Sequence, residues 1–148
     1  NTMSNILVQN IKHTNNTTAQ TIDTSGRTTA LLNNDTTYRS DSGAVTQNLV
    51  QGLVKAWADY TTSSGGNSIN GSGFNVSSIS DVGTGDVRLN YTNNMADANY
   101  SGFASTAAVG LNHIDDQDTT RQRCRTYSDL STEADRNHAY FGVVGDLA

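Results

Sequence analysis

The chain has 148 residues and a formal net charge of −5, a length that fits one domain or two small modules and excludes two large independent cores. Ile, Leu, Val and Phe make up only about 19% of it, which is near the limit for burying enough apolar surface to offset the entropy of folding. The negative charge argues against nucleic acid and anionic membranes as partners, because phosphate groups bind clustered Lys and Arg. We therefore expect copies of the chain to share apolar surface in an oligomer.

Short strands are predicted in the N-terminal region, residues 1–40. The pieces NILVQNIK, TTAQTID and RTTALL are separated by the turn-forming stretches HTNN and DTSG. Each piece buries only two or three apolar side chains, so strands of this kind are marginal on their own. The first twelve residues lack the apolar core of a signal peptide, and no run approaches the length of a membrane span, so no membrane insertion is expected.

A short helix is predicted over residues 41–53. Val45, Leu49 and Leu53 recur every four residues, and the Asp-Ser pair that precedes them offers an N-cap. The apolar stripe is too narrow to bury a helix inside a monomer, but it has the width needed where a few helices meet on an axis. We expect these three residues to line the axis of the oligomer.

An antiparallel β-sandwich or small barrel is predicted for residues 54–148. In VRLNYT, for example, Val87, Leu89 and Tyr91 face one way while the residues between them face the other. The Gly/Ser/Asn-rich segment at 61–73 is interpreted as a surface loop. The predicted strands are VKAWADY, FNVSSIS, VRLNYT, ANYSGFASTA, RQRCRTYS and AYFGVVGDL.

Catalytic motifs are not apparent. His13, His113 and His138 lie in three different segments without metal-ligand spacing, and no G-x-S-x-G sequence appears. No enzymatic activity and no cofactor are expected.

Three carboxylates gather in NHIDDQDTT, residues 112–120. Asp115, Asp116 and Asp118 lie near His113, and carboxylate oxygens are the ligands of hard cations. The spacing is not that of a calcium loop, however, so a solvated acidic loop is the favoured interpretation and no metal is expected.

Cys124 lies between arginines in RQRCRTYS. On a strand it points away from Arg121, Arg123 and Arg125, so a small buried core residue is favoured over a reactive thiol. The three arginines then share one face, which we interpret as solvated or as a contact between subunits rather than as an anion site. As the chain's one cysteine, Cys124 also rules out an internal disulfide.

The segment FNVSSISDVGTGDVRLNYTNNMADANYSG, residues 74–102, resembles a recurrent segment of fibre proteins from tailed bacteriophages and related prophages. In those proteins it tends to follow a strand like KAWADY and to precede an ending like FGVVGDLA. The N-terminal TAQTIDTSGRTT is similar to their shaft or attachment segments. The resemblance covers most of the chain, carries no catalytic motif, and departs from the common pattern at Ala96, where proline is frequent, and in the longer loop at 61–73.

The resemblance implies a non-enzymatic structural protein of the virion, a homotrimeric tail fibre or related appendage that mediates attachment to the host surface. The expected fold is all-β, with a β-rich attachment or shaft region (1–40) that docks on other virion proteins, a short axial helix (41–53) and a C-terminal β-sandwich head (54–148). The alternative is a capsid-attached head fibre or a decoration or cement protein with the same architecture. A glycan-cleaving spike would need paired carboxylates in a groove, and the sequence offers no convincing pair.

Host recognition is expected at loops of the distal end, because strands are committed to packing. Asn and Asp side chains offer the directional donors and acceptors that host-surface glycans need. The loops are 81–86, 92–99 and 112–118, and the candidate contact residues are Asp81, Asp86, Asn93, Asn94, Asn112, His113, Asp115 and Asp116. For assembly, we expect Leu49→Asp to be more damaging than Arg123→Ala, since a solvated arginine contributes little.

Overall fold

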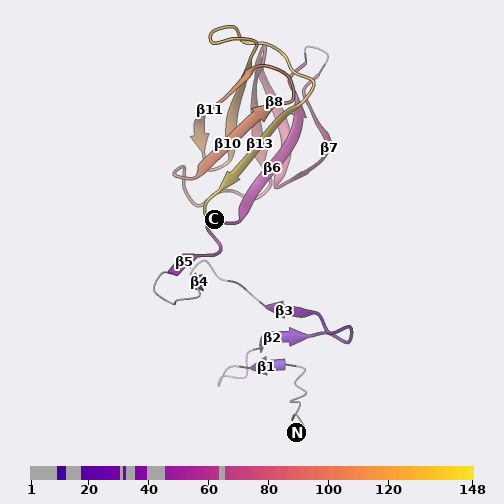
Figure 1. Ribbon diagram of the computed structural model, residues 1–148, viewed down its shortest axis with the longest axis vertical. Coiled ribbons are helices and arrows are strands. Elements are labelled where there is room, and N and C mark those ends of the chain that lie inside the picture. Colours follow the sequence, from indigo (N-terminus) through magenta and orange to yellow (C-terminus); the bar gives the residue numbers. More distant parts are fainter. Residues whose placement is uncertain (1–9, 13–17, 31, 33–35, 40–45, 64–65) are drawn as a thin grey trace.

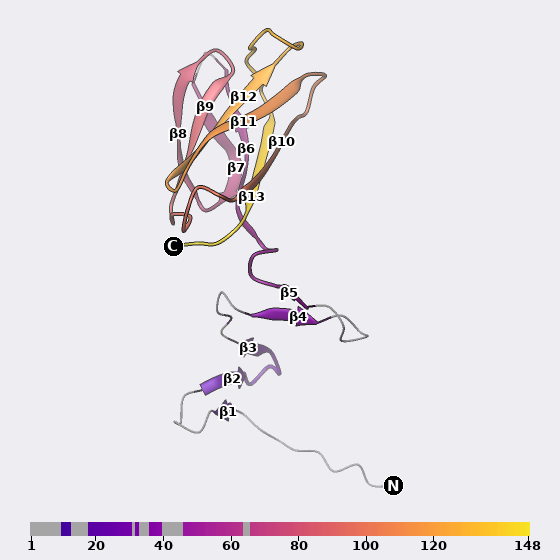
Figure 2. The same cartoon turned by 90° about the vertical axis from the view of Figure 1, so that its left-hand side faces the viewer.

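Antiparallel strands form all the regular structure in the described part of the chain (Figures 1 and 2). The computed structural model describes residues 10–12, 18–30, 32, 36–39, 46–63 and 66–148. Within these ranges the strands form four sheets, and no helix is present. The expectation of an all-β chain is confirmed.

Two small sheets precede the larger part of the molecule. The turn DTSG joins two of their strands as predicted, with Gly26 at a positive φ of 77° and the Asp23 carboxylate accepting the Ser25 and Arg27 N–H groups at 2.8 Å. The first sheet has the order β1-β2-β3 and the second pairs β4 with β5. Their bounds are β1 Asn10–Lys12, β2 Thr18–Ile22, β3 Thr28–Ala30, β4 Thr37–Arg39 and β5 Thr46–Asn48.

The predicted helix at 41–53 is wrong over the residues that the structure describes. Thr46–Asn48 form β5, and a turn follows in which the Asn48 carboxamide oxygen accepts the Gln51 N–H at 2.8 Å. Leu49 and Leu53 are exposed in and beside this turn, while Val45 lies outside the described residues. The four-residue spacing of apolar residues does not produce a helix here, because the Thr, Asn and Gly between them favour strands and turns.

Residues 54–148 form what we call the two-sheet body. One sheet has the order β10-β13-β6-β7 and the other β11-β12-β9-β8, and every neighbouring pair is antiparallel. The sheets face each other, as a β-sandwich requires (Figure 2). The bounds are β6 Val54–Thr61, β7 Ser68–Phe74, β8 Val76–Gly83, β9 Asp86–Tyr91, β10 Ser101–Thr106, β11 Leu111–Asp118, β12 Arg121–Tyr127 and β13 Ala139–Val144.

The core lies between the two sheets and follows the predicted alternation. Val87, Leu89 and Tyr91 of β9 point inward, as the sequence pattern indicated, and the Tyr91 ring stacks on Phe141 with centroids 6.3 Å apart. Cys124 is fully buried, which confirms its interpretation as a core residue. The remaining buried apolar residues are Ala56, Ala58, Tyr60, Met95, Tyr100, Ala139 and Val143.

Two predicted loops are strands. The Gly/Ser/Asn-rich segment at 61–73 contains most of β7, which pairs with β6, and the acidic segment at 112–118 lies in β11, which pairs with β12. Both strands are at sheet edges, where a polar or glycine-rich sequence is tolerated because only one side of the strand is paired. Composition alone therefore misassigned them.

The body has two distinct ends. Strand β6 enters at Val54, at the near end, where the C-terminus also lies, and runs to Thr61 at the opposite, far end (Figure 1). The far end carries the loop after β6, the β8–β9 turn and the segments 107–110 and 128–138. The near end carries the segment 92–100.

Candidate functional site

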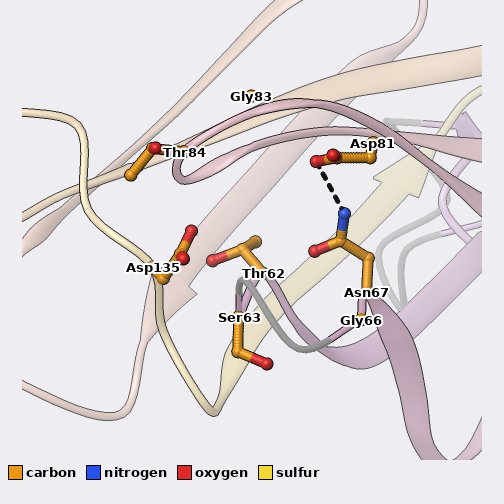
Figure 3. A pocket seen from close by; sticks show the side chains of 8 residues that line it. All are labelled: Thr62, Ser63, Gly66, Asn67, Asp81, Gly83, Thr84 and Asp135. Carbon is orange, nitrogen blue, oxygen red and sulfur yellow. Dashed lines mark hydrogen bonds between the residues drawn. The ribbon is translucent and has the colours of Figure 1, made fainter.

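A polar pocket of about 300 Å³ lies at the far end of the body (Figure 3). Three pieces of chain build it: the loop after β6, the end of β8 with its turn, and the segment that leads into β13. Its volume is at the lower limit for a small-molecule site and suits one sugar ring. The lining residues are Thr62, Ser63, Gly66, Asn67, Asp81, Gly83, Thr84 and Asp135.

Hydrogen bonds hold the base of the far-end pocket in place. The buried Thr62 hydroxyl accepts the Arg136 N–H at 2.8 Å and lies 3.3 Å from the Thr126 hydroxyl. Thr126 in turn donates to the Ala134 carbonyl at 2.6 Å. A pocket on such a base is preorganised, because its floor is anchored to β12 and to the segment that leads into β13.

Gly85 brings the segment before β13 close to the β8–β9 turn. Its φ of +66° suits glycine, and an added Cβ would lie 2.6 Å from the Thr126 carbonyl oxygen and 2.7 Å from that of Ala134. The Gly85 N–H donates to the Asp135 carboxylate at 2.7 Å. This contact fixes Asp135 at the edge of the far-end pocket.

The far-end pocket presents acceptors and hydroxyls to solvent. Asp81 accepts a hydrogen bond from the Asn67 carboxamide at 2.8 Å, which leaves its second oxygen free, and Asp135 likewise uses one oxygen on Gly85. The hydroxyls of Ser63 and Thr84 have no partner within the described part of the chain. With two carboxylates and no Lys, Arg or His in its lining, the pocket favours neutral or cationic ligands over anions.

A second recess of about 290 Å³ adjoins the far-end pocket. It shares Asp135 and is otherwise lined by Ala107, Ala108, Arg136, Asn137 and His138. Two adjacent recesses can take neighbouring units of a chain-like ligand.

The predicted contact residues fall in three different places. Asp81 lies in the far-end pocket, whereas Asn93 and Asn94 are exposed at the near end. The Asn94 carbonyl accepts the Ala148 N–H at 3.0 Å, so this segment lies beside Ala148 at the near end and not at the far end of the body. Asp86 was predicted as a contact residue in an exposed turn. That prediction is wrong, because Asp86 is buried and accepts a hydrogen bond from Arg123.

The other candidates lie on the second sheet. Asn112 is partly buried on the inner side of β11 and donates to the Ser105 carbonyl at 3.1 Å. His113, Asp115 and Asp116 lie on the same strand rather than in the predicted loop.

These β11 side chains belong to an ion-pair network on the outer face of β11-β12-β9-β8. Asp115 Oδ2 lies 3.0 Å from Arg125 Nη2 and 3.8 Å from His113 Nδ1. Asp116 Oδ2 is 3.6 Å from Arg88 Nη2. The three arginines of β12 do share this face, as predicted, but Arg123 and Arg125 are paired with carboxylates instead of simply solvated. The charged groups of the network are therefore largely paired with one another and leave little for an outside ligand to bind.

Metal binding and thiol chemistry find no support in the described residues. No group of three or more His, Cys, Asp or Glu side chains among them could hold a metal ion, and Asp118 uses its carboxylate on the Thr120 N–H at 2.9 Å. Burial raises the pKa of the Cys124 thiol to about 12, so the reactive thiolate is disfavoured. The described part of the chain also contains no helix with the length and apolar character needed to cross a membrane.

Sequence reasoning missed two sets of residues. Asp135 and Asn67 of the far-end pocket carry no local motif, and contacts between the two sheets and between loops at the far end bring them to Asp81. The second set comprises exposed aromatic residues on the outer face of β10-β13-β6-β7: Trp57, Phe74, Phe103 and Tyr140. In KAWADY, Trp57 stands between Ala56 and Ala58, and this alternation of a large and small residues is a signal that could have identified the face.

Comparison with known proteins returned no matching family model, no matching curated protein and no matching solved structure.

Proposed function

We propose that the chain is a non-enzymatic, homotrimeric fibre protein of a phage particle, in which the two-sheet body is the β-sandwich head that contacts host-surface glycans. The sequence resemblance to phage fibre proteins supports this role. In this proposal the N-terminal strands form a shaft that docks on other virion proteins, and the far end of the body points away from the particle.

One observation supports the proposed trimer. Strands β1 to β5 form two small sheets, yet among the residues of this region whose side chains the structure describes none is buried. Sheets of two or three short strands are not stable in water without a covered apolar face. Tyr38, Leu49 and Leu53 are exposed in a single chain, and neighbouring copies around a common axis would cover them.

The far-end pocket is the proposed glycan site. Its free carboxylate oxygens accept hydrogen bonds from sugar hydroxyls, and its negative charge favours neutral sugars or amino sugars over uronic and sialic acids. One such site binds weakly, but three on one axis bind a host surface with avidity.

The trimer is tested by light scattering of the purified full chain at micromolar concentration. We expect a trimer, and we expect Leu53→Asp to dissociate it, since a carboxylate buried between copies without a partner is costly. Leu130→Asp is the matched control, because Leu130 is exposed on the segment before β13, far from the shaft. A folded monomer for the unmodified chain would contradict the proposal.

The glycan site is tested by letting the purified protein compete with phage for adsorption to host cells. Asp81→Asn combined with Asn67→Ala is expected to abolish competition while leaving the trimer and its thermal stability unchanged. Asp97→Asn, at an exposed aspartate of the near end, is the charge-matched control. Undiminished competition by the double variant would remove the far-end pocket from consideration.

A further inference from the structure

The outer face of β10-β13-β6-β7, which we call the aromatic face, exposes an unusual amount of apolar surface. Strand register places Phe103 opposite Gly142, Gly142 opposite Trp57 and Trp57 opposite Phe74, so one row of paired positions crosses all four strands. Tyr140 lies on the same face. The exposed fractions are 43% for Trp57, 51% for Phe74, 53% for Phe103 and 40% for Tyr140. A contiguous patch of this kind marks an interaction surface.

Gly142 makes the row flat. A Cβ at this position would collide with the Phe103 ring, so the ring lies over the glycine backbone in the middle of the sheet. Gly142 is accordingly buried, and the Phe103 ring fills the position between β10 and β6 where a side chain of β13 would otherwise stand. A flat aromatic surface packs against another flat surface with little loss of conformational entropy, because aromatic rings have few rotatable bonds.

Charge distinguishes this face from the opposite one. On the aromatic face the Asp59 carboxylate lies 3.0 Å from Nδ1 of His138, in the row beyond Trp57 and next to Tyr140. The opposite outer face carries the arginine–aspartate network, whose transfer out of water would be costly. If either face packs against protein, the aromatic face is the one that does so favourably.

Chain connectivity identifies the partner. Strand β6 begins at Val54, directly after the turn at Leu49–Leu53 that ends the proposed shaft, and both Val54 and Trp57 are exposed. If three shafts share one axis, each β6 strand begins only a few residues after the shaft and therefore lies close to that axis. The copies of the aromatic face are then held at high effective concentration.

We propose that the aromatic faces of the three bodies pack against one another around the trimer axis, so that the head, and not only the shaft, is an obligate subunit interface. This inference rests on the proposed trimer. It assigns the charged outer faces to solvent and leaves the far-end pocket of each copy accessible.

Trp57 is the chain's single tryptophan and reports directly on this interface. Acrylamide quenching of tryptophan fluorescence is measured on the full chain, with light scattering on the same sample. We expect a trimer whose Trp57 emission is blue-shifted and quenched several-fold less than in the Leu53→Asp variant. Phe74→Ser is expected to raise the concentration at which the heads separate by about tenfold or more. Leu130→Ser, at a more fully exposed leucine of the far end, is expected to leave it unchanged.

The outcomes separate the two proposals. A trimer whose Trp57 is as accessible as in the Leu53→Asp monomer overturns the head interface and leaves the shaft trimer standing. A monomer overturns both. Shielding of Trp57 that occurs only when host-surface polysaccharide is added assigns the aromatic face to a glycan and overturns the subunit contact. Equal effects of Phe74→Ser and Leu130→Ser on head separation also contradict the proposed contact between the aromatic faces.

Discussion

Asp86 shows how a single residue changes meaning between sequence and structure. In the sequence it ends a turn and looks exposed, yet pairing of β9 with β12 brings it to Arg123, which donates to it from Nε at 2.9 Å and from Nη2 at 2.5 Å. Hydrogen bonding to Asp86 raises the pKa of the Arg123 guanidinium further above its usual range. The expectation that Arg123 is an ordinary solvated arginine must therefore be revised.

Replacing Asp86 by asparagine is expected to lower the free energy of unfolding by about 2–3 kcal/mol, because it removes the carboxylate that the partly buried Arg123 and Arg125 share. Urea unfolding measures the change. Asp97→Asn, at an exposed site, is expected to change it by about 0.5 kcal/mol or less. Equal effects of the two substitutions would show that the ion pair between Asp86 and Arg123 does not stabilise the fold.

Acid sensitivity is expected from two aspartates in turns. Asp129 accepts the N–H groups of Ser131 and Thr132 at 2.9 and 2.8 Å, and Asp118 accepts that of Thr120, so these hydrogen bonds hold the pKa of both carboxyls below the usual range. On acidification the carboxyls of the unfolded chain bind protons at a higher pH than those of the folded chain. The stabilisation is therefore present above about pH 4 and is lost as the pH falls through the lowered pKa of the folded state.

The test compares urea midpoints between about pH 6 and pH 3 for the unmodified chain and for Asp118→Asn with Asp129→Asn. The asparagines keep an acceptor oxygen but cannot be protonated, so the double variant should lose stability less steeply on acidification. An unchanged pH dependence would exclude these carboxyls as its source.

At the level of elements, the β8–β9 hairpin was predictable and its surroundings were not. GTGD between two alternating runs indicates a hairpin from local chemistry alone. The contacts of Gly85 with Thr126 and Ala134 come from residues about 40 to 50 positions away, and no local pattern encodes them. The same reason explains β7 and β11, whose polar sequences become strands through pairing with β6 and β12.

Gly85→Ala is expected to destabilise the body by about 2–4 kcal/mol, since its Cβ meets backbone atoms that cannot move aside and its φ is positive. Gly83→Ala in the same hairpin is the matched control, because nothing lies within 4 Å of an added Cβ there. Thermal unfolding of both variants measures the difference. Comparable melting temperatures would mean that the turn relaxes without cost.

For the whole molecule, the sparse apolar composition indicated that copies must share surface, and the structure shows which parts lack cover. The body has its own core, whereas none of the side chains that the structure describes in β2–β5 is buried. The extensive strand contacts are confined either to β1–β5 or to β6–β13. The oligomer was expected from composition and stays a prediction, whereas the division between a part with its own core and a part whose described side chains are not buried could not be read from the sequence.

Heating the full chain is expected to give two transitions. The shaft transition should move to higher temperature as protein concentration rises, because association stabilises it by mass action, while unfolding of the body's core should depend on concentration more weakly. Circular dichroism at three protein concentrations measures both. A single transition that does not depend on concentration would contradict the division.

Strand β13 is the last described strand in chain order, yet it lies in the interior of its sheet, between β10 and β6, and supplies Phe141 and Val143 to the core. During synthesis β6 can pair with β7 early, but its other edge stays open until β13 has emerged from the ribosome. In the proposed trimer, the segments before the body emerge first and can meet those of neighbouring nascent chains before any body has completed its core. For such a trimer, the order of synthesis would favour assembly over premature closure of single copies.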